Sequence, residues 1–175
     1  MMENWNVLVV AERNMEKELL EELSEDGDFE PSGFRDVLVG NVNDIVEFLE
    51  DAEGKKYTHL SRVIPIDDTF FVSPDNLIET LKRRIERYID EFDPGDTFGF
   101  RVERRGMKDK VSSQAVEREV GGYFYDLLEK IYGRKPKVNL KNPDKLIAIE
   151  IVGNRCGFGF ITKEMRNKYR VIRIK

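Results

Sequence analysis

Apolar positions in the first part of the chain fall into short runs and helical stripes that follow one another. Residues 5–11 form an apolar run typical of a buried strand, and residues 14–23 place leucines at helical spacing. In order, the pattern predicts a strand over 5–11, a helix over 14–23, a strand over 37–42, a helix beginning after Asn43 or Asp44, and one or two strands within 58–72 interrupted at Pro65. This β-α-β-α-β series is too short for a doubly wound sheet and predicts a ferredoxin-like first domain.

The rest of the chain carries longer helical stripes and a clear hairpin. Ser73 and Pro74 predict a helix start, with Ser73 as the cap and Pro74 in the first turn, where its missing N–H costs nothing. The pattern then predicts a strand over 98–104, a helix from Ser112 or Ser113 to Gly133, a short strand over 138–140, a hairpin of 146–152 and 156–162 around Gly153 and Asn154, and a final strand over 169–175. The long helix is expected to bury Val116, Val120, Phe124, Leu127 or Leu128, and Ile131. We place a boundary near the Ser73 start, which gives two domains, 1–74 and 75–175.

Charge is divided unevenly between these two parts. Residues 1–75 hold six Lys and Arg against nineteen Asp and Glu, whereas residues 76–175 hold twenty-three against fifteen, and the net charge of −5 hides this difference. A polyanion is attracted to the second part and repelled by the first. The basic part is therefore a candidate nucleic-acid surface.

Composition excludes several kinds of chemistry. Cys156 and His59 are each the single residue of their type, so a Cys/His zinc site lacks its ligands and a catalytic triad would have to use this one imidazole. The Asp67-Asp68 pair could bind a metal or act in acid–base chemistry, but it lies where a strand ends. The sequence contains no Walker A motif, cofactor loop or metal-ligand cluster, so no cofactor is expected. It also lacks a signal-peptide pattern and an apolar stretch long enough to cross a bilayer, so we expect a cytoplasmic protein.

A strand and the loop after it bring five cations directly before a capped helix start. These cations are Arg101, Arg104, Arg105, Lys108 and Lys110. Guanidinium groups bind phosphates through paired hydrogen bonds, and the free N–H groups of a helix N-terminus bind anions. The junction predicts a phosphate-binding site, unless the loop is only a solvated charged segment.

Gly121 and Gly122 fall in the middle of the long predicted helix, where each glycine costs roughly 1 kcal/mol relative to alanine. Gly122 shares a helical face with Gln114, Arg118 and Tyr125, so its bare backbone would lie beside a cation and let a ribose-phosphate chain approach closely. For Gly121, close packing of the helix on a sheet explains the residue at least as well.

The segment 155–161 has two glycines between phenylalanines and invites two functional interpretations. It resembles the aromatic strand of an RNA-recognition motif, but Cys156 and Lys163 replace the basic and final aromatic positions of that motif. It also resembles a dinucleotide loop, but it lies between strands and not at a helix start. We therefore expect its phenylalanines to face the core, and Arg155 at the turn to remain free for a ligand.

From about residue 76 to residue 174 the chain resembles a THUMP domain, an RNA-binding module attached to tRNA-modifying enzymes. The segments that carry the resemblance are the strand ending in 101–106, the serine-led helix from Ser112-Ser113 to Gly121-Gly122, the strands 138–140 and 146–150, and Gly157-Phe158-Gly159. In this family a small ferredoxin-like domain commonly precedes the THUMP domain, and the two together recognise the acceptor end of tRNA with its single-stranded 3′ CCA. The resemblance implies an N-terminal ferredoxin-like domain followed by a THUMP domain with helices packed on a mixed sheet.

The resemblance also implies a non-catalytic adaptor. THUMP-containing enzymes normally carry a methyltransferase, thiouridine synthetase or pseudouridine synthase domain, for which this chain has no room. Its layout is similar to that of stand-alone THUMP proteins that resemble the tRNA-binding adaptor of tRNA cytidine acetyltransferase, which implies a role in N4-acetylcytidine formation with a separate enzyme. The acidic first domain would then set the distance to the modified nucleotide, or dock that enzyme.

The predicted RNA-binding residues extend from the basic strand to the hairpin turn. They are Arg101, Arg104, Arg105, Lys108, Lys110, Ser112, Ser113, Gln114, Arg118, Gly122, Lys135, Lys137 and Arg155. The cations before the helix would hold phosphates, the helix start would hold a terminal nucleotide, and the remaining residues would line or extend the groove. Two other functions stay open: a scaffold whose basic patch meets an acidic protein, and an enzyme with an unrecognised carboxylate site.

Overall fold

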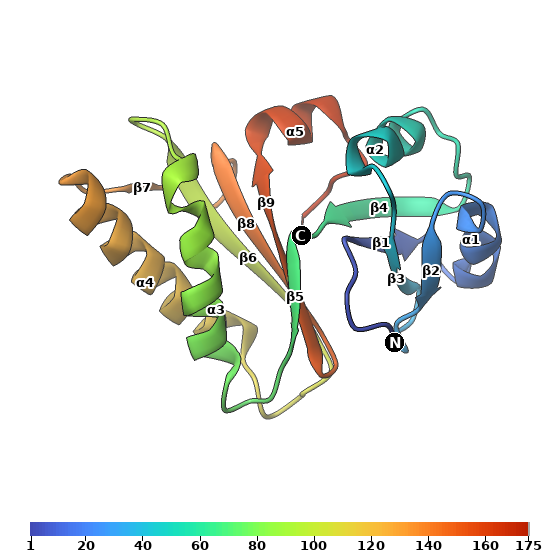
Figure 1. Ribbon diagram of the computed structural model, residues 1–175, viewed down its shortest axis with the longest axis horizontal. Coiled ribbons are helices and arrows are strands. Elements are labelled where there is room, and N and C mark those ends of the chain that lie inside the picture. The colour runs from blue at the N-terminus through green and yellow to red at the C-terminus, as the bar shows by residue number, and fades with distance from the viewer. Residues whose placement is uncertain (175) are drawn as a thin grey trace.

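The first sheet holds four antiparallel strands in the order β2-β3-β1-β4. The computed structural model describes residues 1–174, and Figure 1 shows this sheet with α1 and α2 at one end of the molecule. Its elements are β1 (Val7–Ala11), α1 (Glu16–Leu23), β2 (Asp28–Pro31), β3 (Val37–Asn41), α2 (Ile45–Glu53) and β4 (Leu60–Pro65). This βαββαβ order confirms the ferredoxin-like domain predicted from the apolar pattern.

The sequence pattern missed β2. Its four residues read Asp-Phe-Glu-Pro, so Phe29 is its one large apolar residue. The strand exists because Phe29 packs directly over Gly40 of β3, where a Cβ would lie 2.3 Å from the Phe29 ring. Because β2 has one large apolar residue among four, its sequence shows no alternation of apolar and polar positions from which a strand could be predicted.

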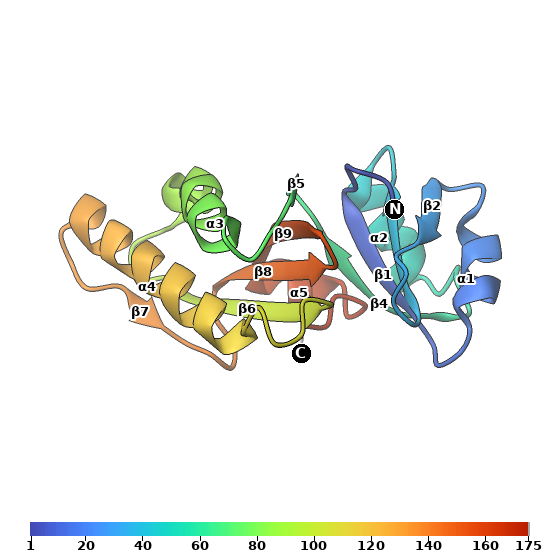
Figure 2. The same ribbon diagram turned by 90° about the horizontal axis from the view of Figure 1, so that it is seen from below.

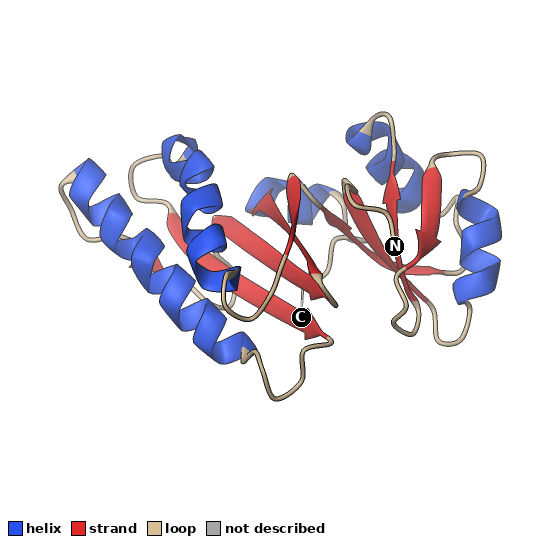
Figure 3. Cartoon of the chain, turned by 60° about the horizontal axis from the view of Figure 1, so that its bottom comes forward, coloured by secondary structure: helices blue, strands red, loops and turns tan. Residues whose placement is uncertain are grey.

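The second sheet has five strands in the order β5-β9-β8-β6-β7. Its elements are β5 (Asp68–Phe71), α3 (Leu77–Ile85), the 3-10 helix η1 (Glu86–Glu91), β6 (Thr97–Arg105), α4 (Ser113–Tyr132), β7 (Lys137–Val138), β8 (Lys145–Val152), β9 (Arg155–Thr162) and α5 (Lys163–Lys168). β6 runs parallel to β7 and β8, and the other pairs are antiparallel. Figures 2 and 3 show α3 and α4 packed beside this sheet.

Both faces of the second sheet are buried, against different partners. One face packs on α3 and α4 through a cluster that includes Phe98, Ile147 and Phe158. The opposite face contributes Leu146 and Ala148 to a cluster that also contains the buried strands of the first sheet. We call this second cluster the shared core, because neither sheet encloses it alone.

Two glycines of β9 allow the first sheet to approach this closely. A Cβ on Gly159 would lie 2.1 Å from the carbonyl oxygen of Pro65, and a Cβ on Gly157 would lie 2.6 Å from the ring of Trp5. No side chain fits at such distances, so both positions require glycine. The glycines are therefore explained by packing of the first sheet on β9.

The phenylalanines that alternate with these glycines point to the other face. The Phe158 and Phe160 rings pack against Tyr88 with centroids 5.9 and 4.8 Å apart. The prediction that they face the core is confirmed.

Two predictions about helix ends need correction. Ser73 does not cap α3: the cap is Asn76, whose side-chain oxygen accepts the Ser73 N–H at 2.9 Å, and the helix begins at Leu77. Ser73 and Asn76 are both capping residues, and the local turn between them decides in favour of the later one. Ile131 is also not buried, with 51% of its surface exposed, because the last turn of α4 turns Leu128 and Tyr132, and not Ile131, towards its neighbours; the helix still ends at Gly133 in the left-handed conformation, φ 72°, as predicted.

The segment after α5 crosses back to the first sheet. The Val63 N–H of β4 donates to the carbonyl oxygen of Val171 at 2.9 Å, and the Val171 N–H donates to Glu53 at 3.1 Å. Ile172 is buried in the shared core. These contacts do not make a ladder, so the strand predicted over 169–175 is wrong for residues 169–174, and residue 175 lies outside the described residues.

The sheets divide the chain between Pro65 at the end of β4 and Asp68 at the start of β5, because β5 pairs with β9. This division lies a few residues before the boundary placed at 74. Within residues 1–174, no helix combines the length and the hydropathy that crossing a bilayer requires.

Candidate nucleic-acid interface

An open groove of about 560 Å³ lies between α4 and the outer edge of β6. β7 pairs with β6 only at Thr97 and Phe98, so the β6 edge beyond them stays uncovered by a strand. The groove is lined by Phe98, Gly99, Phe100, Gln114, Glu117, Arg118, Gly121, Gly122, Tyr125, Val138 and Leu140. We call it the α4 groove; it brings together three predicted residues, Gln114, Arg118 and Gly122.

The walls of the α4 groove differ in chemistry. Val138 and Leu140 form an exposed apolar wall, with 52% and 56% of their surfaces accessible. Gln114 and Arg118 are exposed on the α4 side and have no hydrogen-bond or ion-pair partner within residues 1–174. An apolar wall can contact the face of a nucleotide base, and the amide and the guanidinium opposite it can bind the polar edge of the base and its phosphate.

The two glycines of α4 have no packing role inside the protein. A Cβ on Gly122 would meet no atom within 4 Å, and a Cβ on Gly121 would lie 3.6 Å from the Phe100 ring, an ordinary contact. Close packing on the sheet therefore does not require Gly121. Both glycines lower helix stability while keeping the groove wall bare.

Arg101 is tied to the rim of this groove. Its guanidinium donates to the carbonyl oxygen of Leu140 and, at 3.3 Å, to that of Phe100, and it lies 3.7 Å from the Glu117 carboxylate. Burial raises the pKa of Glu117, and Arg101 opposes that rise. Arg101 thus offsets the negative charge that Glu117 would otherwise present to an anion.

The loop before α4 carries the remaining cations of the predicted junction. Lys108 and Lys110 are exposed. Met107 and Asp109 adopt left-handed backbone conformations, φ 52° and 68°, which cost roughly 1 kcal/mol or more each for residues with a Cβ. Ser112 caps α4 by accepting the Ala115 N–H at 3.2 Å, as one of the two predicted alternatives. Strained backbone next to a capped helix start is typical of binding loops.

Arg104 and Arg105 do not act together. Arg104 stays near the loop and donates to the carbonyl oxygen of Gly106 at 2.5 Å. Arg105 points to the opposite face of β6, where its guanidinium lies 3.2 Å from the carboxylate of Glu150 and only 11% of its side chain is exposed. Burial raises the pKa of Glu150 to about 7 against the lowering effect of Arg105. The Arg105 guanidinium is therefore engaged inside the protein and is not presented to a phosphate.

Arg155 lies outside the α4 groove. It follows the Gly153-Asn154 turn, and its guanidinium donates to the carbonyl oxygen of Glu3. The turn position was predicted correctly, but the side chain is held against the N-terminal segment instead of remaining free.

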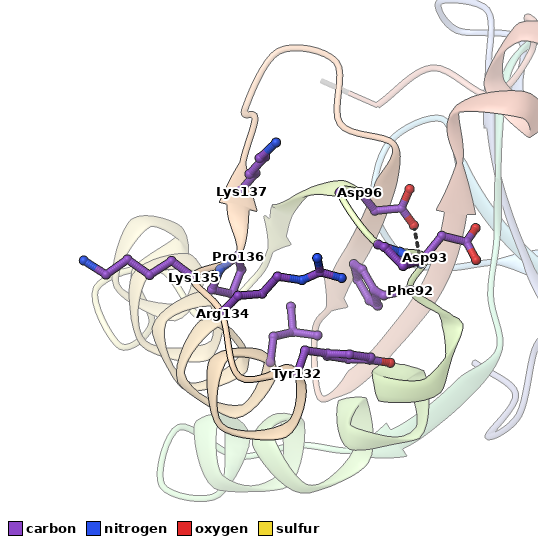
Figure 4. Close-up of a pocket in the computed structure, with 11 residues that line it drawn as sticks. Phe92, Asp93, Asp96, Tyr132, Arg134, Lys135, Pro136 and Lys137 are labelled. Carbon is purple, nitrogen blue, oxygen red and sulfur yellow. Dashed lines mark hydrogen bonds between the residues drawn. The ribbon is translucent and has the colours of Figure 1, made fainter.

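Lys135 and Lys137 belong to a second pocket of about 130 Å³ at the far end of α4. Figure 4 shows Tyr132 at its base, Arg134 reaching across towards Phe92, and the two lysines pointing outwards. Sequence reasoning missed Tyr132 and Arg134, at the end of α4 and in the turn after it, and Phe92, directly after η1.

Asp67 and Asp68, which were considered for metal binding or acid–base chemistry, make contacts within the protein. Asp67 accepts the Tyr88 hydroxyl at 2.6 Å and the Phe160 N–H at 3.0 Å, and Asp68 lies 2.7 Å from Arg84. These two carboxylates are therefore occupied by internal donors.

His59 and Cys156 are also accounted for. His59 Nδ1 lies 3.1 Å from the Glu22 carboxylate. Cys156 is fully buried, and burial raises the pKa of its thiol. Among the described residues 1–174, no group of three or more His, Cys, Asp or Glu is arranged to hold a metal ion.

The profile of the THUMP domain family matches residues 76–160. This stretch begins at the cap of α3, continues almost to the end of β9 and contains the whole α4 groove. The chain contains a THUMP domain. Its second sheet extends slightly beyond the match, because β5 adds an edge strand from residues 68–71.

Solved structures of larger proteins resemble most of the chain. They include PH1313 from Pyrococcus horikoshii, with 16% identity and a TM-score of 0.61, TrmN from Thermus thermophilus, with 22% and 0.63, and a 4-thiouridine synthetase in complex with RNA and bound ATP, with 13% and 0.54. Each match covers 90% of this chain but only 55%, 45% and 41% of the respective neighbour. The likeness shows that the first sheet and the THUMP domain together form a recurring fold. No curated protein matches the sequence.

The outer wall of the THUMP domain groove was also missed at the sequence level. Val138 and Leu140 were recognised as strand residues, but nothing in the sequence shows that β7 is only two residues long and leaves them exposed. Tyr125 carried a usable signal, because it lies on the same helical face as Gln114 and Arg118.

Proposed function

We propose that this protein is a non-catalytic adaptor that binds the acceptor end of tRNA, with its 3′ CCA, and presents the tRNA to a separate modifying enzyme. The partner we propose is an acetyltransferase that forms N4-acetylcytidine. The proposal rests on the α4 groove and on the loop that leads into it.

The observation that carries the proposal is the unexplained pair Gly121-Gly122. Two consecutive glycines in a 20-residue helix cost about 2 kcal/mol together, and no internal contact of either position requires a missing side chain. A ligand that approaches the α4 backbone explains both. A ribose-phosphate chain is such a ligand, because it needs a bare surface near cations.

The charges around the groove support an anionic ligand. Arg118, Lys108 and Lys110 are exposed and unpaired within the described residues. Their ammonium and guanidinium groups can replace the counterions of phosphates, which is the main source of affinity for nucleic acids. The first domain, rich in Asp and Glu, repels RNA and so restricts it to the α4 side.

The geometry suggests how a single-stranded 3′ end is held. The strained loop and the first turn of α4 offer backbone N–H groups and lysines to the terminal phosphates. The adjoining base then lies in the α4 groove, between Tyr125 and the wall of Val138 and Leu140. Contacts with unpaired bases and their backbone favour a free CCA end over a duplex.

One solved structure supports an RNA ligand, and the internal contacts of the carboxylates and the thiol support an adaptor. One neighbour of the same fold, a 4-thiouridine synthetase, was solved as a complex with RNA. The carboxylates and the thiol discussed above are engaged or buried, which supports an adaptor over an enzyme that uses them.

The first experiment compares binding of three ligands at near-physiological salt: an unmodified tRNA, the same tRNA without its 3′ CCA, and a duplex of equal charge. We expect a clear loss of affinity for the trimmed tRNA and for the duplex. Equal binding to all three contradicts acceptor-end recognition and favours the scaffold function instead.

A second experiment addresses the partner. A tRNA cytidine acetyltransferase is assayed on tRNA with and without this protein, and the protein is assayed alone. We expect acetylation to increase when both are present and no turnover by the protein alone. Acetylation that is independent of the protein contradicts this partner without affecting the tRNA-binding part of the proposal.

A further inference from the structure

The second pocket, at the C-terminal end of α4, has the composition of a base-binding site. Its floor is apolar, made by Phe92, Leu128, Tyr132 and Pro136, and its volume of about 130 Å³ is far smaller than a typical cofactor pocket. It suits one flat ring and not a larger ligand. Arg134 stretches across this floor towards Phe92 in Figure 4.

Tyr132 is a preformed stacking surface. Its ring is 40% exposed, and its hydroxyl donates to the carbonyl oxygen of Ile89 at 2.7 Å. This hydrogen bond ties the end of α4 to η1 and fixes the ring, so little side-chain freedom is lost when a base stacks on it. Aromatic side chains of this kind bind bases of any sequence.

The charges at this pocket favour an anion. Arg134, Lys135 and Lys137 have no hydrogen-bond or ion-pair partner anywhere in the described part of the chain. The two carboxylates at the opposite rim, Asp93 and Asp96, are partly offset by the single ammonium of Lys145, which lies 3.9 and 3.6 Å from them, and are outnumbered by the three unpaired cations. The unpaired cations therefore dominate the rim.

The pocket continues the α4 groove along one helix face. Gln114, Tyr125 and Tyr132 are separated by 11 and 7 residues, close to three and two whole turns, so they lie in one line along α4. With a rise of 1.5 Å per residue, Tyr132 lies about 27 Å from Gln114 along the helix axis. A single strand of several nucleotides, the range that such surfaces commonly cover, can reach from one site to the other.

We propose that this pocket binds a second, unpaired RNA base, stacked on Tyr132 with Arg134 on its other side and its phosphate near Lys135 and Lys137. The inference rests on the proposed RNA-binding function and extends the RNA path along the whole of α4. The occupant is RNA, because a fixed aromatic ring beside unpaired cations matches a base joined to a phosphate.

The test measures tRNA affinity for the full-length protein and for single variants. Tyr132→Ala and Arg134→Ala remove the ring and the guanidinium, whereas Tyr132→Phe keeps the ring. Lys130→Ala is the matched control, because Lys130 is an exposed cation on the opposite side of the same helix end. Thermal unfolding of each variant shows whether the fold is retained.

Loss of one stacked base weakens binding by about tenfold, so we expect that change for Tyr132→Ala and Arg134→Ala. We expect a smaller loss for Tyr132→Phe, which keeps the ring but not the hydrogen bond to Ile89, and a small effect for Lys130→Ala. A fluorescent base analogue in the single-stranded part of the RNA should also be quenched by the wild type and not by Tyr132→Ala.

The outcomes separate this inference from the function on which it rests. If the wild type does not bind tRNA, both fail. If Arg118→Ala weakens binding but Tyr132→Ala and Arg134→Ala do not, the second site is wrong and the α4 groove stands. If Arg134→Ala weakens binding but Tyr132→Ala does not, the pocket attracts phosphate alone and base stacking is overturned. The same holds if Tyr132→Phe binds as poorly as Tyr132→Ala.

Discussion

Replacing Gly122 by alanine should stabilise the protein and weaken its binding to tRNA. The new methyl group meets no atom within 4 Å, so it adds no strain, and the helix gains the difference in propensity between alanine and glycine, about 0.8 to 1 kcal/mol. For a chain of 175 residues this corresponds to an increase in Tm of about 2 to 4 °C. In the groove, the same methyl group occupies space assigned to RNA, and one such group in a binding pocket costs about tenfold in affinity.

The assay combines urea and thermal unfolding with tRNA titration of the same variant. Gly133→Ala is the matched control for the unfolding measurements: it is the same substitution at the end of the same helix, but Gly133 has a φ of 72°, so the change should destabilise by about 1 kcal/mol. A destabilised Gly122→Ala protein would show that Gly122 has a packing role that the contacts do not reveal. A stabilised protein with unchanged tRNA affinity would remove Gly122 from the interface.

Four further results are expected. Gly159→Ala should destabilise the fold by more than about 2 kcal/mol in urea unfolding, because its Cβ would collide with the Pro65 backbone at 2.1 Å, and wild-type stability would contradict the tight contact between the sheets. Arg105→Ala should destabilise the fold by up to about 3 to 5 kcal/mol above pH 7, where the buried Glu150 carboxylate is ionised and loses its partner, and by less below pH 6, where a proton neutralises it; equal stability of variant and wild type at pH 8 would contradict the buried pair. Because the folded pKa of Glu150 is raised to about 7, protonated Glu150 favours the folded state, and this contribution to stability is complete below about pH 4.5 and is lost as the pH rises through 7. Urea midpoints measured from pH 5 to pH 8 should therefore fall, and Glu150→Gln should reduce that fall. Arg104→Ala should reduce the salt dependence of tRNA binding by about one phosphate, and an unchanged slope would exclude Arg104 from contact with the RNA backbone.

Local signals predicted the parts of the fold that local interactions decide. The Gly153-Asn154 turn joins two alternating strands, and β8 and β9 pair across it with Val152 opposite Arg155. The Asp44 side chain accepts the N–H groups of two following residues, which fixes the start of α2 as one of the two predicted caps. Such features are visible in a window of a few residues.

The parts that could not be predicted depend on distant partners. Arg105 looks like a free cation in the sequence, but its partner Glu150 is 45 residues away on β8. The sequence did contain a warning, because Arg104 and Arg105 are neighbours in a strand and must point to opposite faces. The tail had no such warning: its contact with Val63 depends on how the two sheets pack.

Three predicted residues lie together in the α4 groove, but the residues of the second pocket other than Lys135 and Lys137 were not predicted. Gln114 was predicted from the helix start and Gly122 from the cost of a glycine within a helix, helical spacing placed both on one face with Arg118, and the structure brings the three into one groove. Tyr132 and Arg134 were missed because the second pocket also needs η1 and the turn after α4, which are brought together only by tertiary folding. Helical periodicity identifies a face, but it does not show what lies opposite that face.

The segment that follows α5 makes the first sheet dependent on residues that are synthesised long after the sheet itself. Tyr169 and Ile172 are buried in the shared core together with strands that end at Pro65. At the usual 5 to 20 residues per second, the ribosome needs roughly 5 to 20 seconds to pass from β4 to these residues. During that time, the residues that pack on the apolar face of the first sheet and on the β4 edge in the folded protein have not yet been made. N-terminal domains generally fold first during synthesis, but the first sheet of this chain completes its packing only after residues 169–172 have been made, so its exposed apolar face is the part of the nascent chain that a chaperone would protect.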